Sequence, residues 1–183
     1  MGEYVEKKIK ILDTNVLIYD YKILSNYPDT TIILPLSVIK ELDKFKRDPS
    51  KGPGVRYVIK QIDKVMEQEP TVVEIMNGNK VEKKDLYKLE NGASLLIEYN
   101  CLESLPKHFH QDMHTDVKVL SVAYFYHTHM KESKVELITN DINLRVQARS
   151  LKIPCTEYEG IVSIEEDQED IYRGWKKISV EAN

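Results

Sequence analysis

The chain has 183 residues, of which 42% are hydrophobic and 31% are charged, and its formal net charge is −4. This composition is typical of a globular protein with one full hydrophobic core, and it excludes a strongly basic protein that binds nucleic acid through its overall charge. The N-terminal residues 1–10 carry charges and no long apolar run, so we expect no secretory signal and no membrane span. Cys101 and Cys155 lack metal-binding spacing and are expected to be reduced thiols of a cytoplasmic protein.

The first half of the chain alternates short β-branched runs with segments of helical periodicity. Proline and glycine residues between positions 48 and 54 predict a loop. Residues 79–92 are polar and show no clear pattern, and residues 94–99 predict a further strand or an edge hairpin. We predict strands over residues 9–12, 31–34 and 72–75, a helix or turn over 16–18, and helices over 35–45 and 55–66.

The second half continues the alternation after a histidine-containing loop over residues 100–115. Alternating strands and helices predict an α/β fold with a central, mostly parallel sheet. After about residue 160 the chain becomes acidic and then aromatic and basic, which favours a domain over residues 1–160 and a tail or linker over 161–183. We predict helices over residues 116–127 and 143–151 and strands over 135–139 and 155–158.

Four acidic residues stand where an apolar run ends or on a predicted helix, namely Asp13, Glu41, Asp116 and Asp141. The carboxyl ends of parallel strands open onto one crevice, so these side chains are expected to meet there. Carboxylates that meet repel one another unless a cation lies between them, and Mg²⁺ and Mn²⁺ prefer oxygen ligands. The four acids therefore predict a divalent-metal site.

Each acid also has a simpler explanation when it is taken alone. Asp116 and Asp141 stand where the helix dipole and helix capping favour an acid. Asp13 could cap the end of a strand, and Glu41 could be a solvated helix residue. The occurrence of all four in one chain favours a functional site.

The segments around these acids, in their order and approximate spacing, resemble the four acidic motifs of a PIN domain. The resemblance spans residues 9–158 and rests on Leu12-Asp13-Thr14-Asn15-Val16-Leu17, Val38-Ile39-Lys40-Glu41-Leu42-Asp43, Asp116…Val119-Leu120 and Thr139-Asn140-Asp141.

Among PIN proteins the chain is most similar to the N-terminal domain of PhoH-like ATPases, through Asp20, residues 41–46 and residues 141–145. The ending at residues 170–175 resembles the passage into the ATPase half of such proteins. No G-x-x-x-x-G-K-[ST] motif is present in the chain, so this chain by itself is not expected to be an ATPase. The chain departs from the PhoH-like pattern at Tyr19 and Tyr21. Val117-Lys118 replace a more polar pair after the third acid, and Asn143 stands where some PIN domains have a further carboxylate.

The resemblance implies a three-layer α/β/α sandwich and a ribonuclease that depends on Mg²⁺ or Mn²⁺. It implies RNA as the partner, endonucleolytic cleavage of single-stranded RNA, and an ATPase domain C-terminal to this chain. The number of metal ions and a homo-oligomeric state stay open.

In this hypothesis Asp13 is the principal metal ligand, and Asp116 and Asp141 complete the cluster directly or through water. Glu41 reaches in from its helix and orients a metal-bound water molecule. Asn15 and Thr139 would fix the rotamers of the carboxylates.

Basic residues on both sides of the acidic crevice are the candidates for phosphate contacts, although a charge run is often only a solvated surface. Tyr19, Tyr21 and Tyr57 could stack on bases. The histidines at positions 108, 110 and 114 fit no zinc pattern and are expected to be loop residues. The candidate nucleic-acid-binding residues are Lys44, Lys46, Arg47, Lys51, Arg56, Arg145 and Arg149.

Three other functions share part of this pattern. A VapC-like toxin ribonuclease has the same acids, but such chains are usually shorter and lack the tail. A phosphatase with an aspartyl nucleophile usually needs a second Asp at the position that Asn15 occupies. A non-catalytic PIN module that binds RNA or regulates an ATPase stays an alternative.

Overall fold

The computed structural model describes residues 7–77, 80–99, 101–109 and 114–160. His110 and the tail over residues 161–183 lie outside the described residues, and the boundary expected near residue 160 stays a prediction.

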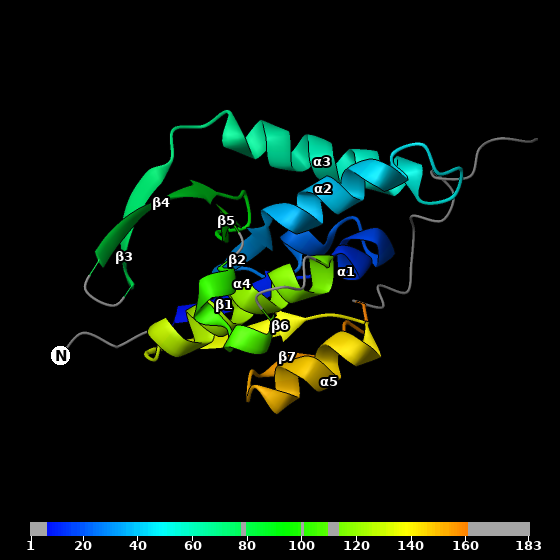
Figure 1. Cartoon of the computed structure of the whole chain (residues 1–183). Coiled ribbons are helices and arrows are strands. Elements are labelled where there is room, and N and C mark those ends of the chain that lie inside the picture. Colours follow the sequence, from blue (N-terminus) through cyan, green and yellow to red (C-terminus); the bar gives the residue numbers. More distant parts are fainter. Residues whose placement is uncertain (1–6, 78–79, 100, 110–113, 161–183) are drawn as a thin grey trace, which may run out of the picture.

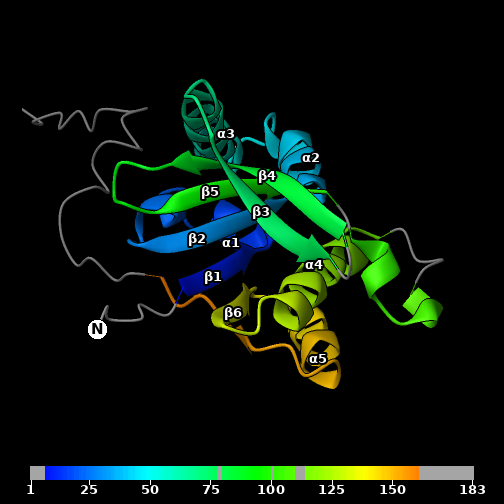
Figure 2. The same ribbon diagram turned by 90° about the vertical axis from the view of Figure 1, so that its left-hand side faces the viewer.

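The described strands form a seven-stranded sheet in the order β3-β4-β5-β2-β1-β6-β7. Strands β1, β2, β5, β6 and β7 pair in parallel, whereas β4 is antiparallel to both of its neighbours. Figure 1 shows α2 and α3 along one side of the sheet and α5 along the other, and Figure 2 shows β5, β2, β1 and β6 side by side. The predicted α/β fold with a central, mostly parallel sheet is confirmed. The strands are β1 (Lys7–Leu12), β2 (Thr30–Pro35), β3 (Thr71–Asn77), β4 (Lys80–Lys88), β5 (Ser94–Glu98), β6 (Ser133–Ile138) and β7 (Cys155–Thr156).

The helices connect these strands and cover the sheet. Helix α4 contacts β6, β1 and β2, and α5 packs on α4 and β7. None of the helices in the described part of the chain combines the length and the hydrophobicity that a membrane-spanning helix needs. The helices are α1 (Thr14–Tyr19), α2 (Leu36–Phe45), α3 (Gly52–Met66), α4 (Thr115–His129) and α5 (Ile142–Ser150), with short 3₁₀ turns η1 (Ile23–Ser25), η2 (Leu102–Ser104) and η3 (Lys107–Phe109).

The order of the strands creates a crevice beside β1. From β1 the chain passes through α1 to β2, and from β6 it passes through α5 to β7, which lies in the opposite direction along the sheet. Right-handed crossovers therefore send the chain to opposite faces after two adjacent strands. Ligands of open α/β sheets bind at such a switch point, outside the carboxyl ends of the strands.

The polar segment over residues 79–92 contains a strand that the sequence pattern did not indicate. Strand β4 pairs with β3 as a hairpin and with β5 at Tyr87 and Lys88, and the hairpin extends away from the helices in Figure 1. Its side chains are largely polar because much of the hairpin is exposed. Strand β5 is not an edge strand, because it lies between β4 and β2.

The loop expected over residues 48–54 is shorter in the structure. Helix α3 already begins at Gly52 and includes Pro53 in its first turn. Proline is compatible with this position because the first N–H groups of a helix have no intrahelical acceptor. The remaining predicted helices and strands are present, with ends that differ by a few residues.

An ion pair between Lys84 and Glu98 lies beside the partly buried Cys101. Glu98 at the end of β5 is almost fully buried, and it accepts hydrogen bonds from Lys84 Nζ (2.9 Å) and from Tyr126 Oη of α4 (2.7 Å). Burial raises the pKa of the Cys101 thiol to about 12, so this free cysteine is protonated and unreactive at neutral pH.

Replacing Tyr126→Phe removes one hydrogen bond from the buried Glu98 carboxylate. A buried charged group that loses a partner costs about 1–3 kcal/mol, so the free energy of unfolding should fall by that amount in urea denaturation. Tyr124→Phe, on the same helix with a partly buried ring, is the matched control and should have a smaller effect. Equal losses for the two variants would contradict the role of the hydrogen bond.

Candidate active site

The carboxyl ends of the central strands surround a pocket of about 490 Å³. The four acids of the sequence hypothesis all lie in its lining, although they come from four separate segments of the chain. Its lining residues are Asp13, Thr14, Asn15, Ile18, Tyr19, Glu41, Phe45, Lys51, Asp116, Asn140 and Asp141.

Asp13 lies at the end of β1 and caps α1, and only 4% of its surface is exposed. One carboxylate oxygen, Oδ1, accepts the backbone N–H of Thr14 at 2.7 Å. The other, Oδ2, accepts the hydroxyl of Thr139 at 2.7 Å. Both oxygens are therefore fixed by the protein, so the carboxylate has one defined orientation.

The buried hydroxyl of Thr139 connects β1 to the segment that follows β6. It donates to Asp13 and accepts from the side-chain amide of Asn15 (3.3 Å) and the backbone N–H of Asp141 (3.1 Å). Asn15 also accepts the backbone N–H of Asn140 at 3.0 Å. A hydroxyl has one donor and two acceptor sites, so Thr139 uses its full hydrogen-bonding capacity.

Glu41 reaches the pocket from the second turn of α2. Its Oε2 accepts the hydroxyl of Thr14 at 2.7 Å. Thr14 is not among the predicted site residues, because nothing in its spacing indicates that its hydroxyl meets a helix residue 27 positions later. The position of Thr14 directly after the first acid is the only signal in the sequence.

The other two acids lie at the starts of helices. Asp141 caps α5, and its Oδ1 accepts the backbone N–H groups of Asn143 (2.7 Å) and Leu144 (3.1 Å). Asp116 is in the first turn of α4. The simpler helix-end explanations are therefore compatible with the structure, and both acids line the pocket as well.

Burial raises the pKa of Asp13 from its ordinary value of 3.8 to about 6. The hydrogen bonds from Thr139 and Thr14 oppose this rise, and the negative charges of Asp116 and Glu41 add to it. At neutral pH the pocket thus holds an ionised carboxylate that its surroundings disfavour. A cation beside Asp13 would relieve this cost.

The oxygen atoms in the pocket lining are suitable ligands for a hard divalent cation. The acids and amides of the pocket offer oxygen atoms, which Mg²⁺ and Mn²⁺ prefer. No group of three acidic, histidine or cysteine side chains within the described ranges is arranged to hold an ion directly. Mg²⁺ usually keeps several waters and binds one or two carboxylates, so the residues present fit an ion held by Asp13 with water-mediated contacts to the others.

Of the candidate phosphate-binding residues, Lys51 lines the pocket and lies with its ammonium 5.1 Å from the centre of the Phe45 ring. Lys46 pairs with Asp43, and Arg56 donates to the backbone carbonyl of Lys46 at 2.6 Å. The remaining two residues of this group, Lys44 and Arg47, are exposed on the α2–α3 segment.

Arg145 does not have the open position expected of a phosphate contact. Its guanidinium donates to the carbonyl of Thr139 (2.9 Å) and pairs with Glu157 (3.0 Å), and only 11% of its side chain is exposed. Its observed role is to hold the segment that carries Thr139. Arg149 is exposed in the last turn of α5, at the end of the helix far from Asp141.

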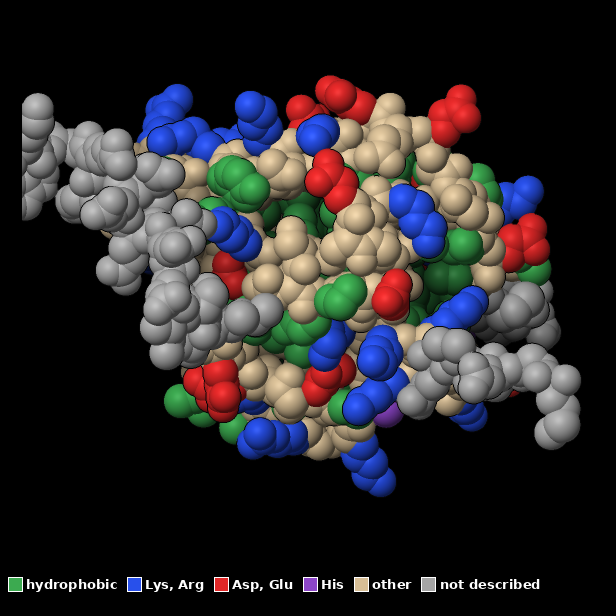
Figure 3. All heavy atoms as spheres, turned by 180° about the vertical axis from the view of Figure 1, so that it is seen from behind, with side chains coloured by type: hydrophobic (Ala, Val, Ile, Leu, Met, Phe, Trp, Pro, Cys, Tyr) green, Lys and Arg blue, Asp and Glu red, His purple; other side chains and the backbone are tan. Residues whose placement is uncertain are grey.

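Positive charge does not form one continuous surface on the face shown in Figure 3. The Lys and Arg side chains there alternate with Asp and Glu side chains. Any attraction for a phosphate backbone on this face is therefore local, in keeping with the net charge of −4.

Two aromatic side chains, Tyr19 and Phe45, belong to the lining of the pocket. Tyr19 lines it and is 64% exposed. Tyr21 and Tyr57 form an edge-to-face pair with ring centres 5.2 Å apart, so part of their surface is used within the fold. His108 stacks near Phe109 outside this pocket.

The chain matches one family model and two curated proteins. The family model described as PIN domain matches residues 10–159. Protein PhoH2 of Bacillus subtilis (strain 168) is 26% identical over 184 residues, which is 94% of this chain and 37% of that protein. Protein PhoH2 of Mycolicibacterium smegmatis (strain ATCC 700084 / mc(2)155) is 26% identical over 168 residues, which is 90% of this chain and 34% of that protein.

The chain thus spans about a third of the length of the curated relatives that it matches. Among solved structures, a domain of a functionally unknown protein from Methanocaldococcus jannaschii DSM 2661 aligns with a TM-score of 0.45 and 18% identity. That alignment covers 95% of this chain and 99% of the other.

In the metal-free protein, Asp13→Asn should raise stability at neutral pH. The wild-type carboxyl titrates near 6 when folded and near 3.8 when unfolded, so its ionisation destabilises the folded state as pH rises through this window. A shift of about two pKa units corresponds to at most about 3 kcal/mol. The asparagine side chain has one acceptor oxygen where the carboxylate has two, so one of the hydrogen bonds from Thr14 and Thr139 is lost and offsets part of this gain. We therefore expect the free energy of unfolding to rise by about 1–3 kcal/mol at pH 7.5, with a smaller difference below pH 4.

Thermal unfolding in chelator across pH 3.5–8 measures this difference. The exposed helix residue Asp63 provides the control, and Asp63→Asn should show no comparable pH dependence. A constant difference between wild type and Asp13→Asn over the whole range would contradict the raised pKa.

Proposed function

This chain belongs to the PIN domain family, and we propose that it is a Mg²⁺- or Mn²⁺-dependent ribonuclease that cuts single-stranded RNA internally. The family has a nuclease-type fold, and its members generally depend on divalent metal ions. The observation that supports the proposal most is the buried Asp13 carboxylate, which shares its pocket with Glu41, Asp116 and Asp141.

Hydrolysis of a phosphodiester needs a positioned water molecule and positive charge near the phosphate oxygens. A divalent ion, when bound, supplies the positive charge that stabilises these oxygens in the transition state. In this proposal Asp13 holds the ion, with Asp116 and Asp141 completing its surroundings. Glu41 orients the attacking water and accepts its proton as the new P–O bond forms, while the P–O bond to the leaving oxygen breaks and that oxygen takes up a proton from solvent. The Thr14 hydroxyl fixes one oxygen of Glu41 for this task.

Contacts to the RNA backbone are proposed for the α2–α3 segment. Lys51 lines the pocket, so its ammonium can reach a phosphate next to the one that is cut. Tyr19, exposed in the same lining, offers a ring on which a base can stack. Lys44, Lys46, Arg47 and Arg56 extend the positive charge along the same segment.

We further propose that the chain is the nuclease part of a PhoH-like system that acts in the cytoplasm. This rests on the resemblance of the motifs around Asp13 and Asp141 and on the two PhoH2 relatives, of which the chain covers about a third. The partner in this proposal is an ATPase domain. The division into a nuclease domain over residues 1–160 and a tail over 161–183 belongs to the same proposal.

The second candidate is a PIN module that binds RNA without cutting it. The observation that favours it is that, in the described part of the chain, no three potential ligands are arranged to hold an ion directly. The two candidates differ in cleavage. A metal-dependent ribonuclease cleaves RNA with metal and only binds it in chelator. A non-catalytic module binds RNA but cleaves it in neither condition.

Asp13→Asn should abolish RNA cleavage while the protein stays folded. Residues that merely orient metal ligands contribute about 10–100-fold, so loss of the principal ligand should cost more than about 100-fold. The assay compares unstructured and structured RNA with Mg²⁺, Mn²⁺ or chelator. Asp43→Asn, an exposed acid two residues after Glu41, is the control and should cleave like wild type. Undiminished cleavage by Asp13→Asn would refute the assignment.

Thr14→Val keeps the shape of the buried side chain but removes the hydroxyl that holds Glu41. We expect kcat to fall about 10- to 100-fold with little change in KM, because Glu41 loses its orientation but RNA binding does not depend on Thr14. Thr14→Ser should restore most of the activity. If Val and Ser behave alike, the hydroxyl has no part in positioning Glu41.

A further inference from the structure

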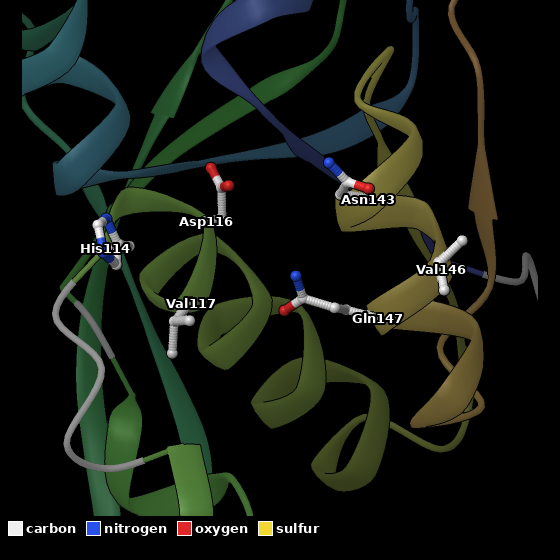
Figure 4. A pocket seen from close by; sticks show the side chains of 6 residues that line it. All are labelled: His114, Asp116, Val117, Asn143, Val146 and Gln147. Carbon is white, nitrogen blue, oxygen red and sulfur yellow. The ribbon is translucent and has the colours of Figure 1, made fainter.

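A second pocket of about 410 Å³ adjoins the candidate active site between the start of α4 and helix α5 (Figure 4). It shares Asp116 with the catalytic pocket, so the two pockets adjoin at this side chain. The chemistry proposed above uses none of its other residues. The pocket is lined by His114, Asp116, Val117, Asn143, Val146 and Gln147.

Two amide side chains form the α5 side of this pocket. Asn143 and Gln147 are four residues apart, which places them one above the other on a single helix face. In Figure 4 the Gln147 side chain extends from α5 toward α4, and the Asn143 side chain lies at the start of α5. Neither amide group is hydrogen-bonded to another group within the described ranges, so both donors and both acceptors are available to a ligand.

Apart from Asp116 and His114, the rest of the lining is apolar. Val117 of α4 is 3% exposed and forms a buried wall, and Val146 of α5 is 58% exposed. No Lys or Arg lines the pocket, so it is not built to bind a second phosphate. Apolar walls with amide groups suit a flat heterocycle that has apolar faces and hydrogen-bonding edges.

We propose that this pocket binds the nucleobase next to the scissile phosphate and that Gln147 reads its edge, with adenine preferred. A carboxamide that faces the Hoogsteen edge of adenine accepts from its exocyclic amine and donates to N7 at once, whereas the corresponding C5 edges of cytosine and uracil offer one polar group each. The inference rests on the proposed ribonuclease function, because Asp116 in both linings sets the base beside the phosphate that is cut.

The first test measures binding without cleavage. Labelled RNA hexamers of A, C and U are titrated into the full chain in chelator, with gel analysis to show that they stay intact. Wild type should bind the A hexamer about 5- to 10-fold more tightly than the others, at the lower end of what one amide–base pair contributes. Gln147→Met keeps the length of the side chain and should lose this preference, with the C and U hexamers affected less than about twofold.

Gln61→Met, in α3 and outside both pockets described here, is the matched control and should keep the wild-type preference. Asn143→Ala should weaken the preference in the same direction as Gln147→Met. A preference for A that survives Gln147→Met, or equal affinities of wild type for all three hexamers, overturns the proposal.

The second test locates the base relative to the cut. A random-sequence RNA is cleaved with Mn²⁺, and the ends are sequenced. Wild type should show adenine enriched at one position flanking the cut, and Gln147→Met should cut with a flat profile there. Cleavage without such enrichment overturns the subsite but not the ribonuclease. Binding preference that depends on Gln147, without any cleavage, supports the subsite and overturns the ribonuclease.

Discussion

The hydrogen bond between the buried Thr139 hydroxyl and the Asp13 carboxylate joins the two strand ends from which the candidate site is built. A fully buried hydroxyl must be satisfied, and this one is satisfied only if Asp13, Asn15 and the Asp141 backbone lie where they do. β1 and β6 are parallel neighbours at which the chain turns to opposite faces, so the bond bridges the switch point itself. The acids that follow each strand are thereby brought into one pocket.

This arrangement destabilises the ionised form of Asp13 in the folded protein. Burial and the charges of Asp116 and Glu41 raise the pKa of Asp13 towards 6, although two hydrogen bonds favour its ionised form. The carboxylate at neutral pH is therefore less stable in the folded protein than in the unfolded chain. Sites that carry chemistry often hold such groups, because a ligand of opposite charge recovers the lost free energy on binding. Membership of a family that generally uses divalent metal ions gives that ligand a chemical identity.

Helix α5 contributes to the candidate site in two ways through one short sequence. Its cap, Asp141, lies in the catalytic pocket, and its next two turns place Asn143 and Gln147 in the adjoining pocket. Arg145, on the same helix, holds the Thr139 carbonyl and Glu157. Chemistry and recognition would thus share one rigid element, which fixes the position of the base relative to the phosphate better than a loop could. Two of the positions at which the chain departs from related PIN sequences, Val117 and Asn143, line this adjoining pocket.

The sequence by itself determined the elements whose signal is local. Apolar runs that end in Asp13 and Asn140-Asp141 predicted two central parallel strands, and the acids after them predicted a common crevice, because strand ends of one direction meet at one edge. Only the tertiary structure decided which polar groups meet. Strand β4 is largely polar because its hairpin is exposed, so its sequence lacks the alternation that predicts a strand. It is a strand because it pairs with β3 and β5. The sequence could not show that Thr14 meets Glu41 or that Arg145 turns inward to Thr139, because hydrogen-bond partners far apart in the chain are chosen by packing and not by spacing.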